Sequence, residues 1–97
     1  MVFLNEQIRE VIKKALGAKL KGQDIKVEYP ADAQYGDYST NISLQMAKVE
    51  KKSPRIVAEE IIAAIKKPDW ISKIEIAGAG FINFYLAPET LTEFVEE

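Results

Sequence analysis

Three side chains at alternating positions near the end of the chain, Phe81, Asn83 and Tyr85, have the chemistry to recognise a planar polar ring. An aromatic ring stacks on a flat base, and a carboxamide both donates hydrogen bonds to the edge of that base and accepts them from it. Because side chains of a strand alternate between its two faces, these three share one face. The other face receives an apolar row: Ile82, Phe84 and Leu86. We therefore predict a core-facing row and an open row with an amide between two rings.

The strand that carries these residues is predicted to be the second half of a β-hairpin spanning residues 74–86. Gly78 and Gly80 flank Ala79, and glycine adopts the positive φ angles of a tight reversal at little steric cost. The same glycines superficially resemble a dinucleotide-binding fingerprint, with Asn83 where the third glycine belongs. A strand follows where that fingerprint needs a helix, so we exclude nucleotide binding at this turn.

Each of these side chains also has a purely structural interpretation. In it, the rings of Phe81 and Tyr85 only cover the second face of a sheet. Asn83 is harder to explain, because β propensity disfavours a carboxamide in mid-strand; its side chain is either exposed to solvent or used for binding. Gly36 and Asp37 favour a turn that leads into a helix, with a functional role as the second option.

One dense group of basic residues stands near the middle of the chain: Lys48, Lys51, Lys52 and Arg55. A charge run of this kind is typical of a solvated surface, but it is also the best candidate here for contacts to phosphate. The whole chain has 13 basic and 15 acidic residues, a net charge of −2. Nonspecific affinity for a phosphate backbone should therefore be weak, and any nucleic-acid contact must be local.

Length and composition predict one domain, residues 1–97, with 47% hydrophobic residues to fill one core. The absence of cysteine and histidine removes thiolate metal sites, cysteine nucleophiles and the usual general base. No Walker sequence or metal-ligand spacing is visible, so we expect no catalysis, no ATP binding and no metal in this chain. No apolar run reaches membrane-spanning length, and the first residues lack the charged-then-apolar pattern of a signal peptide. We therefore expect a cytoplasmic location and no membrane partner.

Apolar periodicity predicts the helices that must position these side chains. The first spans residues 4–16 with Gly17 as its C-cap, or continues through residues 18–20 as far as Gly22. A second helix should follow, with Ser39, Thr40 or Asn41 as its cap, and should continue up to the charged residues 48–52. A third begins at Ser53-Pro54, with serine as N-cap and proline at the first helical position, and continues to Lys67 before Pro68.

Strands are expected around the hairpin. Residues 25–29 alternate Ile, Val and Tyr with charged residues, and a short extended piece is centred on Tyr38. Trp70 is expected to cover one end of the core, and Pro88 opens a last amphipathic helix that is truncated at the chain end. The predicted fold class is α+β, with a small, mainly antiparallel sheet of about four strands and helices packed on one face.

Three stretches together resemble the N-terminal additional domain of arginyl-tRNA synthetases. They are residues 35–41 (Tyr-Gly-Asp-Tyr-Ser-Thr-Asn), residues 53–59 (with Ser-Pro-Arg and Ala-Glu) and residues 76–84 (Ile-Ala-Gly-Ala-Gly-Phe-Ile-Asn-Phe). They occur in the order and spacing of that family and span nearly the whole chain. The resemblance implies a small α/β unit that reads the D-loop of tRNA near its elbow. Phe81 and Asn83 fall on the aromatic and amide positions that would engage an exposed D-loop base.

The resemblance assigns supporting roles to other residues. Gly80 belongs to the tRNA-binding turn, Tyr85 would support the stacking platform, and the basic residues that would touch phosphates are Lys51, Lys52 and Arg55. Two positions depart from the family: Ala79 stands where proline is frequent, which should loosen the turn, and Ser39 replaces a frequent alanine. The catalytic and ATP signatures of the parent class I ligase are missing. The expected unit is thus a non-catalytic, monomeric domain without a cofactor of its own, whose partners are tRNA and the remaining domains of the synthetase.

Two other functional classes stay open at this point. One is a protein-interaction module that uses the acidic final segment or the open sheet face against another domain. The other is a free-standing small-molecule sensor, which is disfavoured because no cluster of charged ligand-binding groups adjoins the glycine-rich turn.

Overall fold

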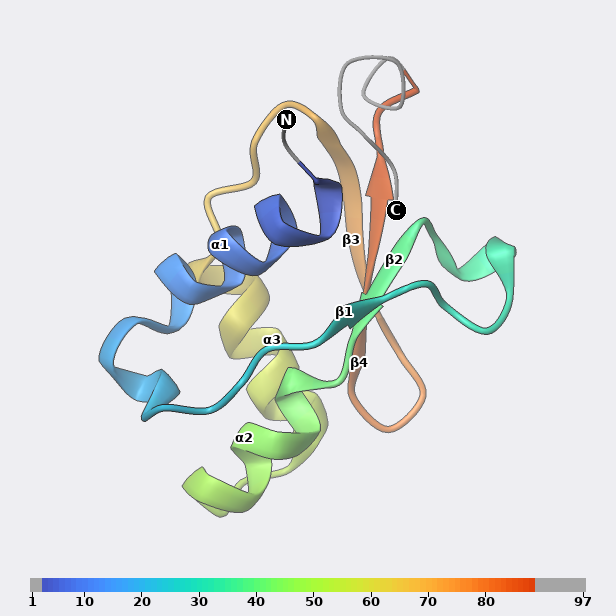
Figure 1. The fold of residues 1–97 in the computed structure, drawn as a ribbon. Helices are drawn as coiled ribbons and strands as arrows, with labels where there is room; N and C mark the ends of the chain where they lie inside the picture. Colours follow the sequence, from blue (N-terminus) through green and yellow to red (C-terminus); the bar gives the residue numbers. More distant parts are fainter. Residues whose placement is uncertain (1–2, 89–97) are drawn as a thin grey trace.

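The computed structural model describes residues 3–88. It shows a four-stranded sheet with helices against one face (Figure 1). The strands lie in the order β1-β2-β4-β3, and each neighbouring pair is antiparallel. Their bounds are β1 Val27–Glu28, β2 Tyr38–Thr40, β3 Ile71–Ala77 and β4 Phe81–Leu86. The α-helices are α1 Leu4–Leu16, α2 Ile42–Glu50 and α3 Pro54–Ala64. The predicted α+β class is confirmed.

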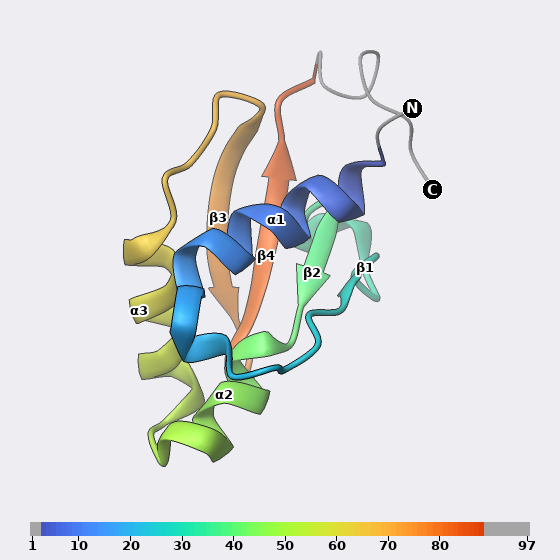
Figure 2. The same cartoon turned by 60° about the vertical axis from the view of Figure 1, so that its left-hand side comes forward.

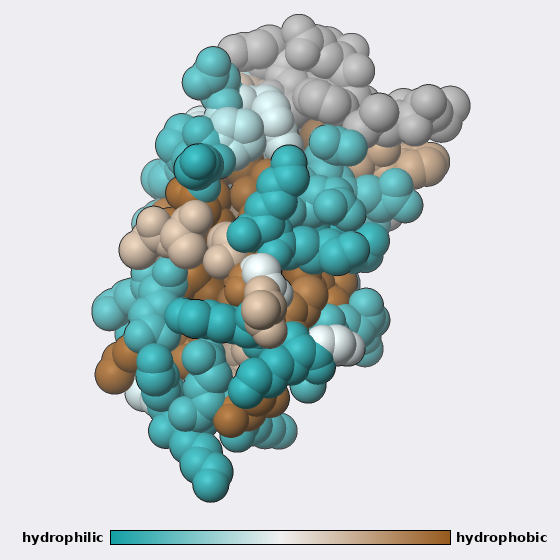
Figure 3. Space-filling view, turned by 90° about the vertical axis from the view of Figure 1, so that its left-hand side faces the viewer, coloured by the Kyte–Doolittle hydropathy of each residue, from teal (hydrophilic) through white to brown (hydrophobic). Residues whose placement is uncertain are grey.

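The core lies between the sheet and the helices. Figure 2 shows α1 crossing in front of β4 and β2, with α3 beside β3 on the same side of the sheet. Ile82 and Phe84 of β4 are fully buried there, opposite an apolar stripe of α1 that consists of Leu4, Ile8, Ile12 and Leu16. The outer side of the helical layer is mainly hydrophilic, with hydrophobic surface visible between the helices (Figure 3). This arrangement follows from the amphipathic periodicity of the helices.

The ends of the helices follow local chemistry, with one exception. Gly17 caps α1 at a φ of 53°, as predicted, and a 3-10 turn, Gly17–Leu20, follows it. Pro54 starts α3 after Ser53, also as predicted, but the helix ends at Ala64 and not at Lys67. Ile65 is already extended, with a ψ of 128°. The predicted end was wrong because the chain needs the residues after Ala64 to reach β3, and Pro68 disfavours helix in the residue before it.

The first strand is shorter than the predicted segment 25–29. Ile25 and Val27 are buried as expected, whereas the side chain of Tyr29 is 54% exposed. Its ring stacks on Tyr38 with the centroids 5.2 Å apart, at the edge of the sheet just before Pro30. The extended piece expected at Tyr38 is β2, so the turn at Gly36 leads into a strand before the helix begins.

Two further expectations concern the end of the chain. Trp70 is partly buried and packs against the core, as predicted for a covering side chain. The helix predicted after Pro88 lies outside the described residues. None of the helices within residues 3–88 combines the length and the apolar character needed to cross a bilayer.

Candidate functional site

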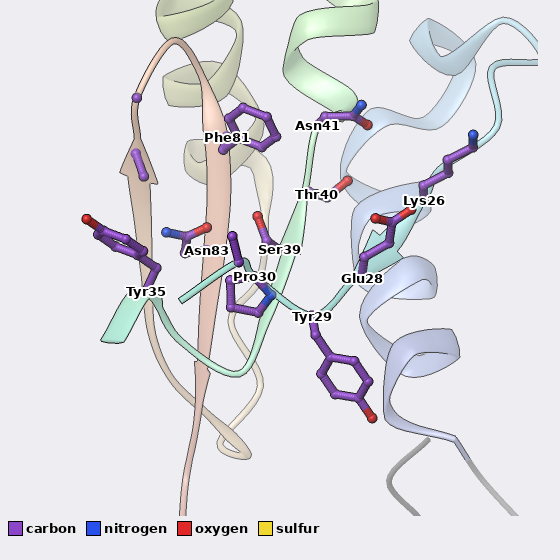
Figure 4. Close-up of a pocket in the computed structure, with 13 residues that line it drawn as sticks. Lys26, Glu28, Tyr29, Pro30, Tyr35, Ser39, Thr40, Asn41, Phe81 and Asn83 are labelled. Atoms are coloured by element: carbon purple, nitrogen blue, oxygen red, sulfur yellow. The ribbon is translucent and has the colours of Figure 1, made fainter. Parts of the chain in front are cut away.

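A cavity of about 600 Å³ opens on the face of the sheet that the helices leave uncovered. Its floor contains Ser39 of β2 and Asn83 of β4, which are direct register partners. Phe81 and the hairpin turn lie at one end, and the connection between β1 and β2 supplies Tyr35 at the other (Figure 4). Sheet pleating therefore brings residues from three distant parts of the chain to one hollow.

The two faces of β4 differ as the alternation predicts. Ile82 and Phe84 have no exposed surface, while the ring of Phe81 on the opposite face is 43% exposed and lines the cavity. An exposed aromatic ring at the wall of a pocket is available for stacking on a ligand. The predicted assignment of faces is confirmed.

Asn83 lies on the cavity floor with only 3% of its surface exposed. Within residues 3–88 its carboxamide has no hydrogen bond to another side chain or to the backbone. The alternative in which Asn83 is simply exposed is therefore wrong. Neither polar atom of this carboxamide is among the fully buried atoms that lack a partner, so the amide opens onto the cavity, where a ligand or water can pair with it.

The turn before Phe81 is fixed to the start of α3. Gly80 has a φ of +147° and packs so tightly that an added Cβ would stand 2.7 Å from the Cβ of Pro54. Arg55 donates a hydrogen bond of 2.8 Å from Nη1 to the carbonyl of Gly78, which itself lines the cavity. Gly80 thus contributes by its conformation and close packing, and Arg55 lies at the rim of the cavity.

Tyr85 shares the face of Phe81 and Asn83 but does not line the cavity. Its hydroxyl donates a 3.1 Å hydrogen bond to the carbonyl of Gln34, and the ammonium of Lys73 lies 4.2 Å from its ring centroid. Desolvation, with the nearby Glu75 carboxylate, raises the pKa of Tyr85, so the hydroxyl stays protonated and able to donate at neutral pH. This tyrosine supports the connection that carries Tyr35.

The residues after Tyr35 also connect this segment to β4 through hydrogen bonds and close packing. The backbone N–H of Asp37 donates to the carbonyl of Phe84 at 2.9 Å, and a carboxylate oxygen of Asp37 accepts from the N–H of Leu86 at 2.8 Å. A Cβ on Gly36 would stand 2.8 Å from the carbonyl oxygen of Phe84, so only glycine fits there. Sequence reasoning missed Tyr35 as a site residue; its position before the Gly36-Asp37 turn was the available signal.

The lysines of the predicted basic cluster, Lys48, Lys51 and Lys52, do not line the cavity. The ammonium of Lys52 pairs with the Glu60 carboxylate at 3.0 Å. The hydrogen bond to Glu60 raises the pKa of Lys52. Of the predicted phosphate contacts, only Arg55 adjoins the candidate site. No group of three or more potential His, Cys, Asp or Glu metal ligands occurs among the residues that the structure describes.

Comparison with known proteins identifies the fold and its family. The sequence profile described as "Arginyl tRNA synthetase N terminal domain" matches residues 3–86. The chain belongs to this family. This chain is 47% identical over 96 residues to an arginine–tRNA ligase of Listeria welshimeri. The match covers 97% of this chain and 17% of that ligase. A ligase of Bacillus licheniformis is 43% identical over 94 residues, again with 17% of its length covered.

Solved structures agree with this assignment. The N-terminal domain superposes on Thermus thermophilus arginyl-tRNA synthetase with a TM-score of 0.79 and 26% identity, over 93% of this chain and 15% of the synthetase. A Plasmodium falciparum arginyl-tRNA synthetase shares the fold, with a TM-score of 0.74 at 18% identity over 90% of this chain and 16% of that one. The chain thus corresponds to about a sixth of the length of these relatives.

Proposed function

We propose that this N-terminal domain recognises tRNA for an arginine–tRNA ligase by holding an exposed base of the D-loop in the cavity. The observation that carries the proposal is the carboxamide of Asn83 on the cavity floor, beside the exposed ring of Phe81. A stacking surface next to an unpaired amide suits an unstacked nucleobase. Membership of the family supports tRNA as the source of that base.

In this mechanism each residue has a distinct task. Phe81 stacks on the face of the base, and Asn83 forms hydrogen bonds with its edge. Arg55, held by its bond to Gly78 at the cavity rim, keeps N–H donors for a phosphate of the same loop. Lys51 and Lys52 contribute weaker, more distant attraction, because Lys52 is already paired with Glu60.

The parent enzyme supplies the chemistry. We propose that a ligase containing this domain attaches arginine to tRNA with ATP in the cytoplasm, and that ATP binds to its other domains. With a net charge of −2, the 97-residue chain alone should bind tRNA weakly, because it releases few counterions. Tight, salt-insensitive binding of this chain to unrelated RNA, or saturable ATP binding in calorimetry, contradicts this division of tasks.

The decisive experiment compares Phe81→Ala and Asn83→Ala in a full-length ligase that carries this domain. Base stacking is worth about 1–3 kcal/mol, so Phe81→Ala should raise the KM for tRNA by roughly one order of magnitude or more while kcat changes less. Asn83→Ala should reduce discrimination among D-loop bases more than overall affinity, because the amide contacts the base edge. Aminoacylation kinetics with native and D-loop-substituted tRNA measure both effects.

Two controls make the result specific. Ile56→Ala removes another exposed apolar side chain, 50% exposed on α3 and outside the cavity, and should leave the kinetics unchanged. If Arg55 contacts a phosphate, Arg55→Gln should make the slope of log K for tRNA association against log salt concentration about one unit less negative. The proposal fails if both Phe81→Ala and Asn83→Ala unfold the domain but leave tRNA recognition in the surviving enzyme unchanged.

A further inference from the structure

The connection between β1 and β2 brings a second exposed aromatic side chain to the cavity. Tyr35 is 48% exposed and lines the hollow. Within residues 3–88 its side chain has no hydrogen bond and no ring contact. A half-exposed ring that is not stacked on another ring can stack on a ligand.

Contacts on both sides of Tyr35 hold it in position. The preceding carbonyl, that of Gln34, accepts the hydrogen bond from Tyr85, and Asp37 exchanges two hydrogen bonds with β4. The close approach of Gly36 to Phe84 leaves no room for another residue type. All of these contacts are made to β4, the strand that carries Phe81 and Asn83. The backbone at Tyr35 is therefore held in place relative to those two side chains, which reduces the entropic cost of binding.

The cavity has room for more than one nucleobase. Figure 4 shows Asn83 between Phe81 on one side and Tyr35 on the other, so the two rings are not stacked on each other. The volume of about 600 Å³ lies within the range of roughly 300–1,000 Å³ that complete small-molecule ligands occupy, and one base is smaller than such ligands. Two rings that flank one amide offer two separate stacking surfaces.

We propose that the cavity takes two neighbouring nucleotides of single-stranded RNA, with one base stacked on Phe81 and the adjacent one on Tyr35. This inference rests on the proposed function, because it specifies the ligand of the same cavity. Asn83 lies between the two stacking surfaces and discriminates the base on Phe81. Tyr35 is then a binding residue, and Tyr85 is a positioning residue that acts through Gln34.

The test uses the full-length ligase with tRNAs that carry an abasic nucleotide at one D-loop position at a time. With the unmodified enzyme, the KM for tRNA should rise at two adjacent positions. Phe81→Ala should abolish the sensitivity at one position, and Tyr35→Ala should abolish it at the neighbour. Tyr35→Ala alone should raise the KM about fivefold to tenfold, the lower part of the range for base stacking, with kcat unchanged.

Two matched variants separate stacking from other effects. Tyr35→Phe keeps the ring and should retain sensitivity at the second position, whereas loss of that sensitivity would contradict stacking by the ring. Val49→Ala removes another exposed apolar side chain, which does not line the cavity. It should leave both position-specific responses intact.

The outcomes distinguish this inference from the proposed function. Suppose that Phe81→Ala abolishes sensitivity at one D-loop position. If Tyr35→Ala then changes the sensitivity at no position, or only at that same position, the two-nucleotide site is wrong and the single-base function stands. If neither variant changes the response to any D-loop position, both proposals fail. Urea unfolding of Tyr35→Ala, expected to match the unmodified protein because the ring is exposed, excludes misfolding as the cause.

Discussion

Gly80 lies directly against Pro54: a Cβ added to Gly80 would stand 2.7 Å from the proline Cβ and 3.0 Å from its carbonyl carbon. The first residue of α3 thereby fixes the hairpin turn, and Phe81 follows that turn immediately. The positive φ of +147° at Gly80 is a conformation that other residues rarely adopt. The direction of the Phe81 side chain thus depends on a glycine that contacts a helix.

Gly80→Ala should therefore destabilise the domain through backbone strain and through the clash with Pro54. Each effect is worth about 1–3 kcal/mol, so the free energy of unfolding should fall by at least the lower value. Gly78→Ala is the matched control, because Gly78 has a φ of +57° with no atom within 4 Å of an added Cβ. It should cost only about 1 kcal/mol. Urea unfolding of both variants measures their free energies of unfolding. A loss of stability for Gly80→Ala that is equal to or smaller than that for Gly78→Ala contradicts this prediction.

Phe84 and Phe81 belong to opposite faces of β4 and should respond differently to truncation. Phe84 is fully buried, so Phe84→Ala should lower the free energy of unfolding by about 3–5 kcal/mol. Phe81 is 43% exposed, and Phe81→Ala should cost less than about 1 kcal/mol. Thermal unfolding of the two variants makes the comparison. Similar losses for both would mean that Phe81 is a structural residue.

Asp37 holds the connection that carries Tyr35 against β4. Asp37→Ala leaves the partly buried N–H of Leu86 without its acceptor, which should cost about 1–3 kcal/mol. Asp37→Asn keeps an oxygen acceptor and should cost less. Unfolding measurements and hydrogen exchange of the Leu86 amide provide the readouts. Unchanged exchange of this amide in Asp37→Ala would show that the bond contributes little.

The ion pair between Lys73 and Glu75, 3.0 Å long, should be visible in acid titration. The hydrogen bond from Lys73 and its charge lower the pKa of Glu75. A carboxyl group whose pKa is lower in the folded state stabilises the fold above its unfolded pKa of about 4.3, and this contribution is lost as the pH falls through the folded value. The contribution should be small, because both side chains are exposed to solvent and salt.

Lys73→Met should move the Glu75 pKa upward, toward its ordinary value, in an NMR titration of the side-chain carboxyl carbon. The unfolding free energy of the variant should also depend less on pH in the same acid range. Added salt should produce a similar but weaker upward movement in the unmodified protein. A Glu75 pKa that stays in place after the substitution would assign the lowered value to another group.

Local patterns determined much of the fold. The alternation in residues 81–86 set the two faces of β4, and the flanking glycines set the hairpin, because strand pleating and turn chemistry act over a few residues. Gly17 marked the end of α1 and Ser53-Pro54 the start of α3 for the same reason. The pairing of exposed Phe81 with Asn83 on one face also followed from the sequence, while their contact with tRNA stays a prediction.

Only the tertiary structure decided how the cavity is built. Asn83 is buried because the β1–β2 connection and the hairpin enclose the floor of the hollow, which no pattern within β4 encodes. Tyr35 reaches the cavity through the bond between Tyr85 and Gln34, residues that are 51 positions apart. The early end of α3 likewise depends on where β3 must begin. Such features depend on contacts between distant segments, and a sequence read by local periodicity carries no information about which segments meet.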